Sequence, residues 1–164
     1  MTALLKGSRF EYTLEKATEL GVDVIVPFSA QRSVVQIPAG KRASKQARWQ
    51  RICDSAIRQC ARPGRALVTE PTTLADAISL AGKDGAKLLA LNERDPEAKW
   101  PADLTGPLAL VIGPEGGFVD AEVETLRAAG ASFAGLGPTV VRAETAAAAA
   151  VTVVRMVRSG LLTP

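Results

Sequence analysis

Short apolar segments alternate with amphipathic segments along almost the whole chain, and this alternation constrains the fold more than any other feature of the sequence. The apolar segments have the length and composition of buried strands, and they fall at residues 22–28, 66–69, 86–91, 108–112 and 132–136. The amphipathic segments have helical periodicity, and they fall at residues 8–20, 42–62, 73–81, 120–129 and 144–158. We therefore predict an α/β fold, with helices on both faces of a mostly parallel sheet, in one domain over residues 1–164.

The first helix carries end signals in the sequence. Ser8, with Glu11 three residues later, matches a capping box, and Gly21 is a typical C-terminal stop. Residues 94–106 contain two prolines and little periodicity, so we predict a loop there.

The residue types that are missing exclude several kinds of chemistry. The chain has no histidine, which excludes Ser-His-Asp and Cys-His nucleophile systems and histidine-based zinc sites. Its two cysteines, Cys53 and Cys60, lie seven residues apart in one predicted helix, roughly 10 Å apart and too far for a disulfide. No apolar run approaches the ~18 residues of a membrane span, and the N-terminus lacks the apolar core of a signal peptide. We therefore expect a cytoplasmic protein.

Positive charge is concentrated in one segment. Residues 41–65 carry eight Lys or Arg and one Asp, whereas the whole chain has a net charge of only +3. A basic segment in a chain that is otherwise net acidic suggests a polyanionic partner. The alternative is an ordinary solvated helix surface.

Two glycine-bearing turns follow predicted strands and lead into predicted helices. They are the segments GPEGGF at 113–118 and LGPTVVRAETA at 136–146. In open α/β sheets, ligands bind at the carboxyl ends of the strands, where both turns are expected. Neither segment is a phosphate-binding Walker A loop or a dinucleotide fingerprint. The alternatives are simple tight turns, with Glu144 or Thr145 serving only to cap a helix.

Four segments in order resemble one known family. Besides IGPEGGF at 112–118 and the segment at 136–146, KGSRFEYTLEKATELGVDVIVPFSAQRSVV at 6–35 and RWQRICDSAIRQCARP at 48–63 match its pattern. The chain resembles SPOUT methyltransferases, and more narrowly the RsmE type, which methylates N3 of a uridine in 16S ribosomal RNA of the small subunit.

The resemblance implies a fold, a cofactor and an assembly. The implied fold ends in a deep trefoil knot, a feature too rare to be derived from spacing. The implied cofactor is S-adenosylmethionine, with no metal, and the implied partners are the small ribosomal subunit and a second copy of the chain in a homodimer. The alanine-rich run at 143–150 fits such a dimer contact. The matching cofactor-binding positions are Leu91, Gly113, Pro114, Gly116, Gly117, Leu136, Gly137, Val140, Val141 and Thr145.

The resemblance also implies roles for charged residues. Arg142, which matches the arginine of the family's RAETA segment, would stabilise charge that develops on the uracil carbonyl groups. Because the chain has no histidine, Glu115 and Glu144 are the candidate acceptors of the N3 proton. The predicted contacts to RNA phosphates are Arg32, Lys45, Arg48, Arg58 and Arg62.

The chain departs from the family pattern in three places. Thr139 stands where the family usually has an arginine, and Val119-Asp120 stands where a serine usually caps the following helix, so we expect Asp120 to cap instead. The family's N-terminal, PUA-like RNA-binding barrel precedes the equivalent of Lys6, and we expect residues 1–164 to lack it. We therefore expect residues 1–164 to be the catalytic domain alone.

Three other functions are alternatives to this interpretation. A ribose 2′-O-methyltransferase would share the fold and the cofactor. A dimeric RNA-binding module without activity would share the fold alone. A nucleotide hydrolase is disfavoured because the sequence offers neither a phosphate loop nor a cluster of metal ligands.

Overall fold

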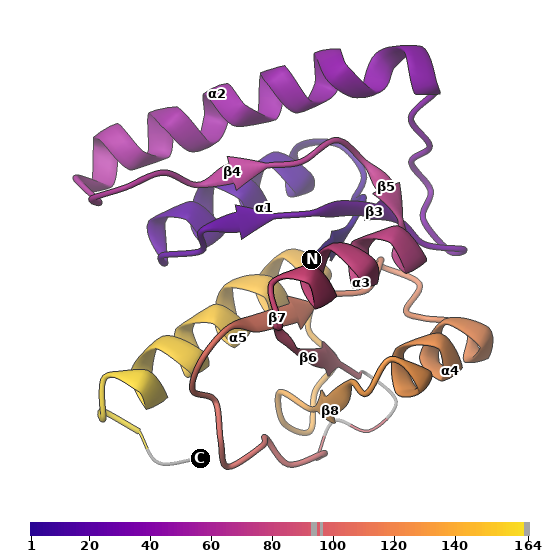
Figure 1. Cartoon of the computed structure of the whole chain (residues 1–164), viewed down its shortest axis with the longest axis vertical. Helices are drawn as coiled ribbons and strands as arrows, with labels where there is room; N and C mark the ends of the chain where they lie inside the picture. The colour runs from indigo at the N-terminus through magenta and orange to yellow at the C-terminus, as the bar shows by residue number, and fades with distance from the viewer. Residues whose placement is uncertain (93–94, 96, 163–164) are drawn as a thin grey trace.

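The computed structural model of the chain describes residues 1–92, 95 and 97–162 (Figure 1). Residues 94 and 96 of the predicted 94–106 loop lie outside this described part. The strands are β1 (Thr2–Ala3), β2 (Val24–Ile25), β3 (Pro27–Ser29), β4 (Leu67–Val68), β5 (Thr72–Thr73), β6 (Lys87–Leu91), β7 (Leu108–Val111) and β8 (Ser132–Ala134). The helices are α1 (Ser8–Glu19), α2 (Arg42–Cys60), α3 (Leu74–Lys83), α4 (Asp120–Ala128) and α5 (Ala143–Arg158), with a short 3-10 turn η1 (Ala39–Lys41).

Every strand pairing among the described residues is parallel. The strands form three groups, with the orders β1-β3-β5, β2-β4 and β7-β6-β8. A parallel bridge between Thr2 and Ile112 joins the first group to the third, and the Ala3 amide donates to the Ile112 carbonyl at 2.9 Å. The prediction of a mostly parallel α/β fold is therefore confirmed.

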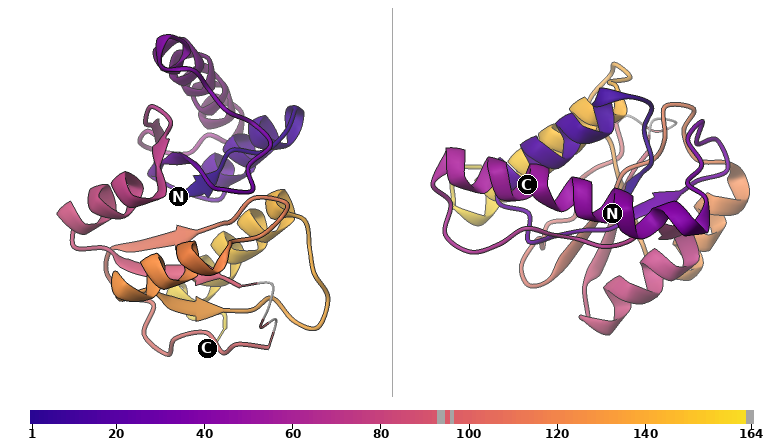
Figure 2. Two further views of the ribbon diagram at one scale, coloured as in Figure 1. Left: turned by 90° about the vertical axis from the view of Figure 1, so that its right-hand side faces the viewer. Right: turned by 90° about the horizontal axis from the view of Figure 1, so that it is seen from above.

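Helices cover both faces of the strands, as predicted. Along β6, Leu89 and Leu91 belong to one buried cluster, and Leu88 and Ala90 belong to another. This alternation follows from the two-residue period of a strand. The first cluster is shared with α1, α2 and α5, and the second with α3 and α4. In Figure 2, α4 lies in front of the β6–β8 strands and α5 behind them.

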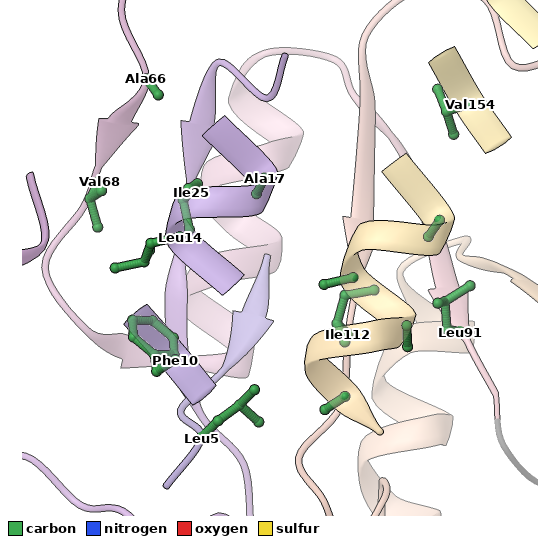
Figure 3. Packing of buried hydrophobic residues seen from close by; sticks show 14 of the residues in the cluster. Leu5, Phe10, Leu14, Ala17, Ile25, Ala66, Val68, Leu91, Ile112 and Val154 are labelled. Carbon is green, nitrogen blue, oxygen red and sulfur yellow. The ribbon is translucent and has the colours of Figure 1, made fainter. Parts of the chain in front are cut away.

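Helices α1 and α5 pack side by side over the larger cluster (Figure 2). Figure 3 shows Leu14 of α1 directed toward Val68, with Phe10 near Leu5 and Ile112 beside α5. The ring of Phe10 also contacts that of Trp49 from α2, with centroids 4.6 Å apart. The N-terminal helix is thus fixed between α2 and α5 by apolar burial.

Several boundaries differ from the predictions for physical reasons. The single strand predicted over 22–28 is two short strands, β2 and β3, which pair with different partners. Helix α2 ends at Cys60, because Ala61 adopts a left-handed conformation with φ 52°. Strands β1 and β5 are additional to the predicted strands, because both lie outside the apolar runs of the sequence.

Two predicted caps are wrong. Ser8 is the first residue of α1 and not its cap. Gly7 occupies that position, with no side-chain hydrogen bond. Val119, not Asp120, is the N-cap of α4, and its amide donates to the carboxylate of Glu122 at 3.0 Å. By contrast, Gly21 follows α1 with φ 98°, as a C-terminal stop requires.

Both cysteines of α2 are free thiols. Cys53 is fully buried in the larger cluster, whereas Cys60 is half-buried. Burial raises the pKa of the Cys53 thiol above its ordinary value of 9.0. None of the described helices has the length and apolar character needed to cross a bilayer.

Candidate functional site

A pocket of about 310 Å³ lies where β6, β7 and β8 end. Parallel strands bring their carboxyl ends to one edge of the sheet, so segments distant in sequence meet there. Eight of the predicted site residues line this pocket: Leu91, Gly113, Pro114, Glu115, Leu136, Val140, Val141 and Arg142. Gly116, Gly117, Gly137, Thr145 and Glu144 are outside its lining, although each belongs to one of the segments that form it.

The first glycine-bearing segment is a tight turn after β7. The Gly117 amide donates to the Pro114 carbonyl at 2.9 Å, and Gly117 has φ 68°, which favours glycine. Gly113 is constrained differently, because a Cβ atom there would lie 3.1 Å from the ring of Phe118. Phe118 is itself buried and stacks on Phe28, with centroids 6.4 Å apart. The turn is therefore fixed on the smaller core cluster.

A second loop packs against this turn. Arg32 donates from Nη1 to the Gly116 carbonyl at 2.8 Å, and a Cβ atom on Gly116 would lie 3.1 Å from Arg32 Cβ. The adjacent Gln31 amide donates to Glu122 Oε1 of α4 at 2.8 Å. Arg32 is exposed, so its remaining donors face solvent beside the turn.

The second glycine-bearing segment runs from β8 to α5. Gly137 has φ 98°, and the Gly135 carbonyl accepts a hydrogen bond from Trp100 Nε1 at 2.8 Å. Val140 lines the pocket and is 73% exposed. Arg142 is the exposed N-cap of α5, so its side chain stands where the pocket opens to solvent.

Arg9 of α1 also lines the pocket, and the sequence reasoning did not single it out. Its Nη1 atom lies 3.2 Å from Glu115 Oε1, and its Nε atom lies 3.9 Å from Glu144 Oε1. The Lys6 amide donates to the same Glu115 oxygen at 3.2 Å. In the sequence, Arg9 is marked only by its place in the segment at 6–35 that resembles the RsmE-type family.

The two candidate acids are not equivalent. Glu115 Oε1 accepts from both Arg9 and Lys6, and this side chain is 24% exposed. The Glu144 side chain is 13% exposed, and its buried Oε2 atom has no hydrogen-bond partner. A buried carboxylate oxygen without a partner is unfavourable unless a ligand supplies a donor.

The predicted RNA contacts have different surroundings. Arg58 is exposed, Lys45 is half-buried, and Arg48 is 56% exposed in an ion pair with Glu11 at 2.6 Å. The Arg62 guanidinium is instead occupied: it donates to the Thr18 and Val22 carbonyls, and it pairs with Asp23 at 2.6 Å. Arg62 therefore caps the C-terminal end of α1, and we leave it out of the proposed RNA surface.

Among the residues that the structure describes, no three His, Cys, Asp or Glu side chains are arranged to hold a metal ion.

The sequence and the fold match a known class of enzyme domains. The family model of the RNA methyltransferase domain matches residues 1–155, and the chain belongs to this family. Its relatives place it with the RsmE type of SPOUT methyltransferases.

Three relatives carry that placement. The ribosomal RNA small subunit methyltransferase E of Mycobacterium bovis is 36% identical over 163 residues, covering 96% of this chain and 62% of the relative. A Neisseria gonorrhoeae ribosomal RNA small subunit methyltransferase E bound to S-adenosylmethionine superimposes with TM-score 0.86 at 28% identity, covering 95% of this chain and 64% of that one. A Legionella pneumophila protein in complex with the same cofactor superimposes with TM-score 0.85 at 35% identity, with the same two coverages. The chain thus spans less than two thirds of each of these relatives.

Proposed function

We propose that this chain binds S-adenosylmethionine in the pocket at the strand ends and methylates N3 of a uridine in 16S ribosomal RNA. The observation that carries the proposal is the convergence of Leu91, the Gly113–Gly117 turn and the 136–142 loop on one pocket, with Arg142 at its opening. Relatives of the same fold hold S-adenosylmethionine in their crystal structures.

The residues present suit this cofactor. Apolar side chains at Leu91, Ile112 and Leu136 can cover an adenine ring. The backbone of the glycine-bearing turn can approach a polar ligand closely. The volume of about 310 Å³ is at the lower end of the range for small-molecule sites. When bound, the cofactor supplies an electrophilic methyl group on a sulfonium ion.

The chain's own residues would orient the uridine and move its proton. Uracil N3–H is a weak acid, so negative charge develops on the uracil carbonyl oxygens as the proton leaves. The Arg142 guanidinium stabilises that charge at the pocket opening. Glu144 accepts the N3 proton, and we prefer it to Glu115 because its Oε2 atom has no other partner. N3 then forms its bond to the methyl carbon as the carbon–sulfur bond breaks.

The wider proposal follows the family. Arg32, Lys45, Arg48 and Arg58 contact RNA phosphates, two copies pack as a homodimer, and the segment after β8 completes a trefoil knot. The protein acts in the cytoplasm on the small ribosomal subunit, with residues 1–164 as its methyltransferase domain. Its activity on RNA depends on these partners as well as on the pocket.

The first test is calorimetric titration of S-adenosylmethionine into the purified chain. We expect saturable binding that is lost in Gly117→Val, because valine strongly disfavours φ 68°. Circular dichroism of the variant checks that it is folded. Absence of binding to the folded parent chain would contradict the proposal and favour an RNA-binding module without activity.

A second test separates base from ribose methylation. The chain is incubated with 16S ribosomal RNA and labelled cofactor, and the digested nucleosides are analysed by mass spectrometry. We expect the label on the uracil base. Label on the ribose would favour a 2′-O-methyltransferase, which the same fold can accommodate.

A further inference from the structure

We propose that Arg9 is a positioning residue of the pocket, which holds the glycine-bearing turn and the start of α5 at binding distance from each other. The inference rests on the proposed function, because it assigns Arg9 to the cofactor pocket. It adds to the site a residue from helix α1, whereas the other residues that line the pocket come from the ends of strands, the loops that follow them or the start of α5.

The geometry joins three elements. Arg9 stands in the first turn of α1, Glu115 in the turn after β7 and Glu144 in the first turn of α5. One guanidinium reaches both carboxylates, at 3.2 Å and 3.9 Å. The two walls also meet through the β7-β6-β8 pairing and the larger buried cluster, and Arg9 adds a direct polar link between them at the pocket.

Helix α1 is a rigid support for this contact. Phe10 and Leu14 are 3% and 0% exposed in the larger core cluster, and α1 packs directly on α5. The neighbouring Lys6 amide donates to the same oxygen of Glu115. The turn is therefore held by two donors, the backbone amide of Lys6 just before α1 and the side chain of Arg9 in its first turn.

The charge of Arg9 is as important as its reach. Glu115 and Glu144 would repel each other at one pocket, and a cation between them offsets that repulsion. The fork of a guanidinium can serve two acids at once, whereas an ammonium acts as a single point charge. Arg9 also engages the Oε1 atom of Glu144, whereas the buried Oε2 atom has no hydrogen-bond partner.

The test compares Arg9→Met and Arg9→Lys with a matched control, Lys16→Met. Lys16 is a cation of the same helix that also contacts two carboxylates, those of Glu15 and Glu19, but it does not line the pocket. Affinity for S-adenosylmethionine is measured by calorimetry on the full chain. Because the Arg9 side chain is 44% exposed, we expect Arg9→Met to weaken binding about 3- to 10-fold. We expect Arg9→Lys to restore part of the loss and Lys16→Met to leave affinity unchanged.

Two further readouts separate positioning from general stability. In the free chain, Arg9→Met should speed hydrogen exchange at the Gly116 and Gly117 amides, and Lys16→Met should not. In a Glu115→Gln background, Arg9→Met should weaken S-adenosylmethionine binding by less than it does in the parent chain. The reason is that the ion pair between Arg9 and Glu115 is already lost in that background.

The outcomes are distinguishable. If the parent chain does not bind the cofactor, the proposed function and this inference both fail. If the parent binds and Arg9→Met behaves like Lys16→Met, only the role of Arg9 is overturned. If Arg9→Met weakens binding equally with and without Glu115, the residue does not act through that acid and the inference is also overturned. Arg9→Lys keeps the test informative should Arg9→Met unfold.

Discussion

Arg32 Nη1 lies 2.8 Å from the carbonyl oxygen of Gly116, although 84 residues separate them in the chain. The side chain of Arg32 covers the face of Gly116 on which any Cβ atom would stand. At Gly116 the glycine-bearing turn is therefore covered by an exposed side chain, that of Arg32. At Gly113 it is covered by a buried one, the ring of Phe118.

This difference predicts unequal costs for two alanine substitutions. In Gly116→Ala the new Cβ lies 3.1 Å from Arg32 Cβ, which moves only with its loop. Arg32 is exposed, so the loop can shift by a few tenths of an ångström, and we expect a loss of at most about 1 kcal/mol from the Arg32 hydrogen bond. In Gly113→Ala the buried Phe118 ring has little freedom, and overpacking should cost about 1–3 kcal/mol. Urea denaturation of both variants measures the free energies of unfolding. Equal losses would contradict the prediction.

Substitution of Arg142 should separate chemistry from cofactor binding. We expect Arg142→Ala to lower methyl transfer to 16S ribosomal RNA by about 100-fold or more, because charge on the uracil carbonyls loses its stabilising group. Calorimetric affinity for S-adenosylmethionine should stay close to that of the parent. Arg155→Ala, on the far end of the same helix, is the matched control. Transfer by Arg142→Ala at the parental rate would rule out this role.

Substitution of Arg62 should change the stability of the fold, whereas substitution of Arg58 should change RNA binding. Arg62→Ala removes donors to the Thr18 and Val22 carbonyls, so we expect a loss of about 1–3 kcal/mol in stability. Arg58→Ala should leave stability nearly unchanged but reduce the salt slope of RNA binding by about 0.7–0.9. Thermal unfolding and RNA binding at several salt concentrations measure the two effects. The assignment would be reversed if Arg62→Ala changed only the salt slope.

The two cysteines should differ in reactivity. Burial raises the pKa of the Cys53 thiol, so at pH 8 it remains protonated and shielded, whereas Cys60 is half-buried. We expect Ellman's reagent to modify Cys60 in the native chain and both thiols in urea. Cys60→Ser provides the control, since the native variant should then show almost no reaction. Fast labelling of that variant would be inconsistent with a closed core around Cys53.

Stability at acid pH should depend on the start of α3. The Thr73 and Thr72 hydroxyls donate to the carboxylate of Asp76, which lowers its pKa below the ordinary value of 3.8. The folded-state pKa is lower than the unfolded one, so this contribution is complete above pH ~4 and is lost as the pH falls through the folded pKa. Asp76→Asn should therefore be less stable than the parent at neutral pH and lose less stability on acidification. Denaturation midpoints from pH 6 to pH 2.5 measure this, and parallel pH curves would contradict it.

The sequence was sufficient for the features that depend on local pattern. The apolar runs at 86–91, 108–112 and 132–136 contain β6, β7 and β8, and the glycine-bearing segments after β7 and β8 meet at one pocket. These features follow from strand periodicity and from the common edge of a parallel sheet, both of which a single sequence contains.

Contacts between distant segments could not be predicted in this way. Glu115 is 106 residues from Arg9, and no local pattern indicates which cation will face it. For the same reason Arg62 appeared to be one more basic residue of a helix, although it closes the end of α1. The catalytic and RNA-binding roles of the site residues remain predictions, because they concern ligands and not the chain alone.

The bridge between Thr2 and Ile112 sets an order on folding. The first strand lies beside a strand end that is translated 110 residues later, and closing so long a loop is slow. While the chain emerges from the ribosome, the N-terminal half has a parallel edge with no neighbour. The pocket beside Arg9 can therefore form only after that neighbour arrives, so a truncated chain lacking β7 would lose the geometry of α1 at the site as well as the glycine-bearing turn.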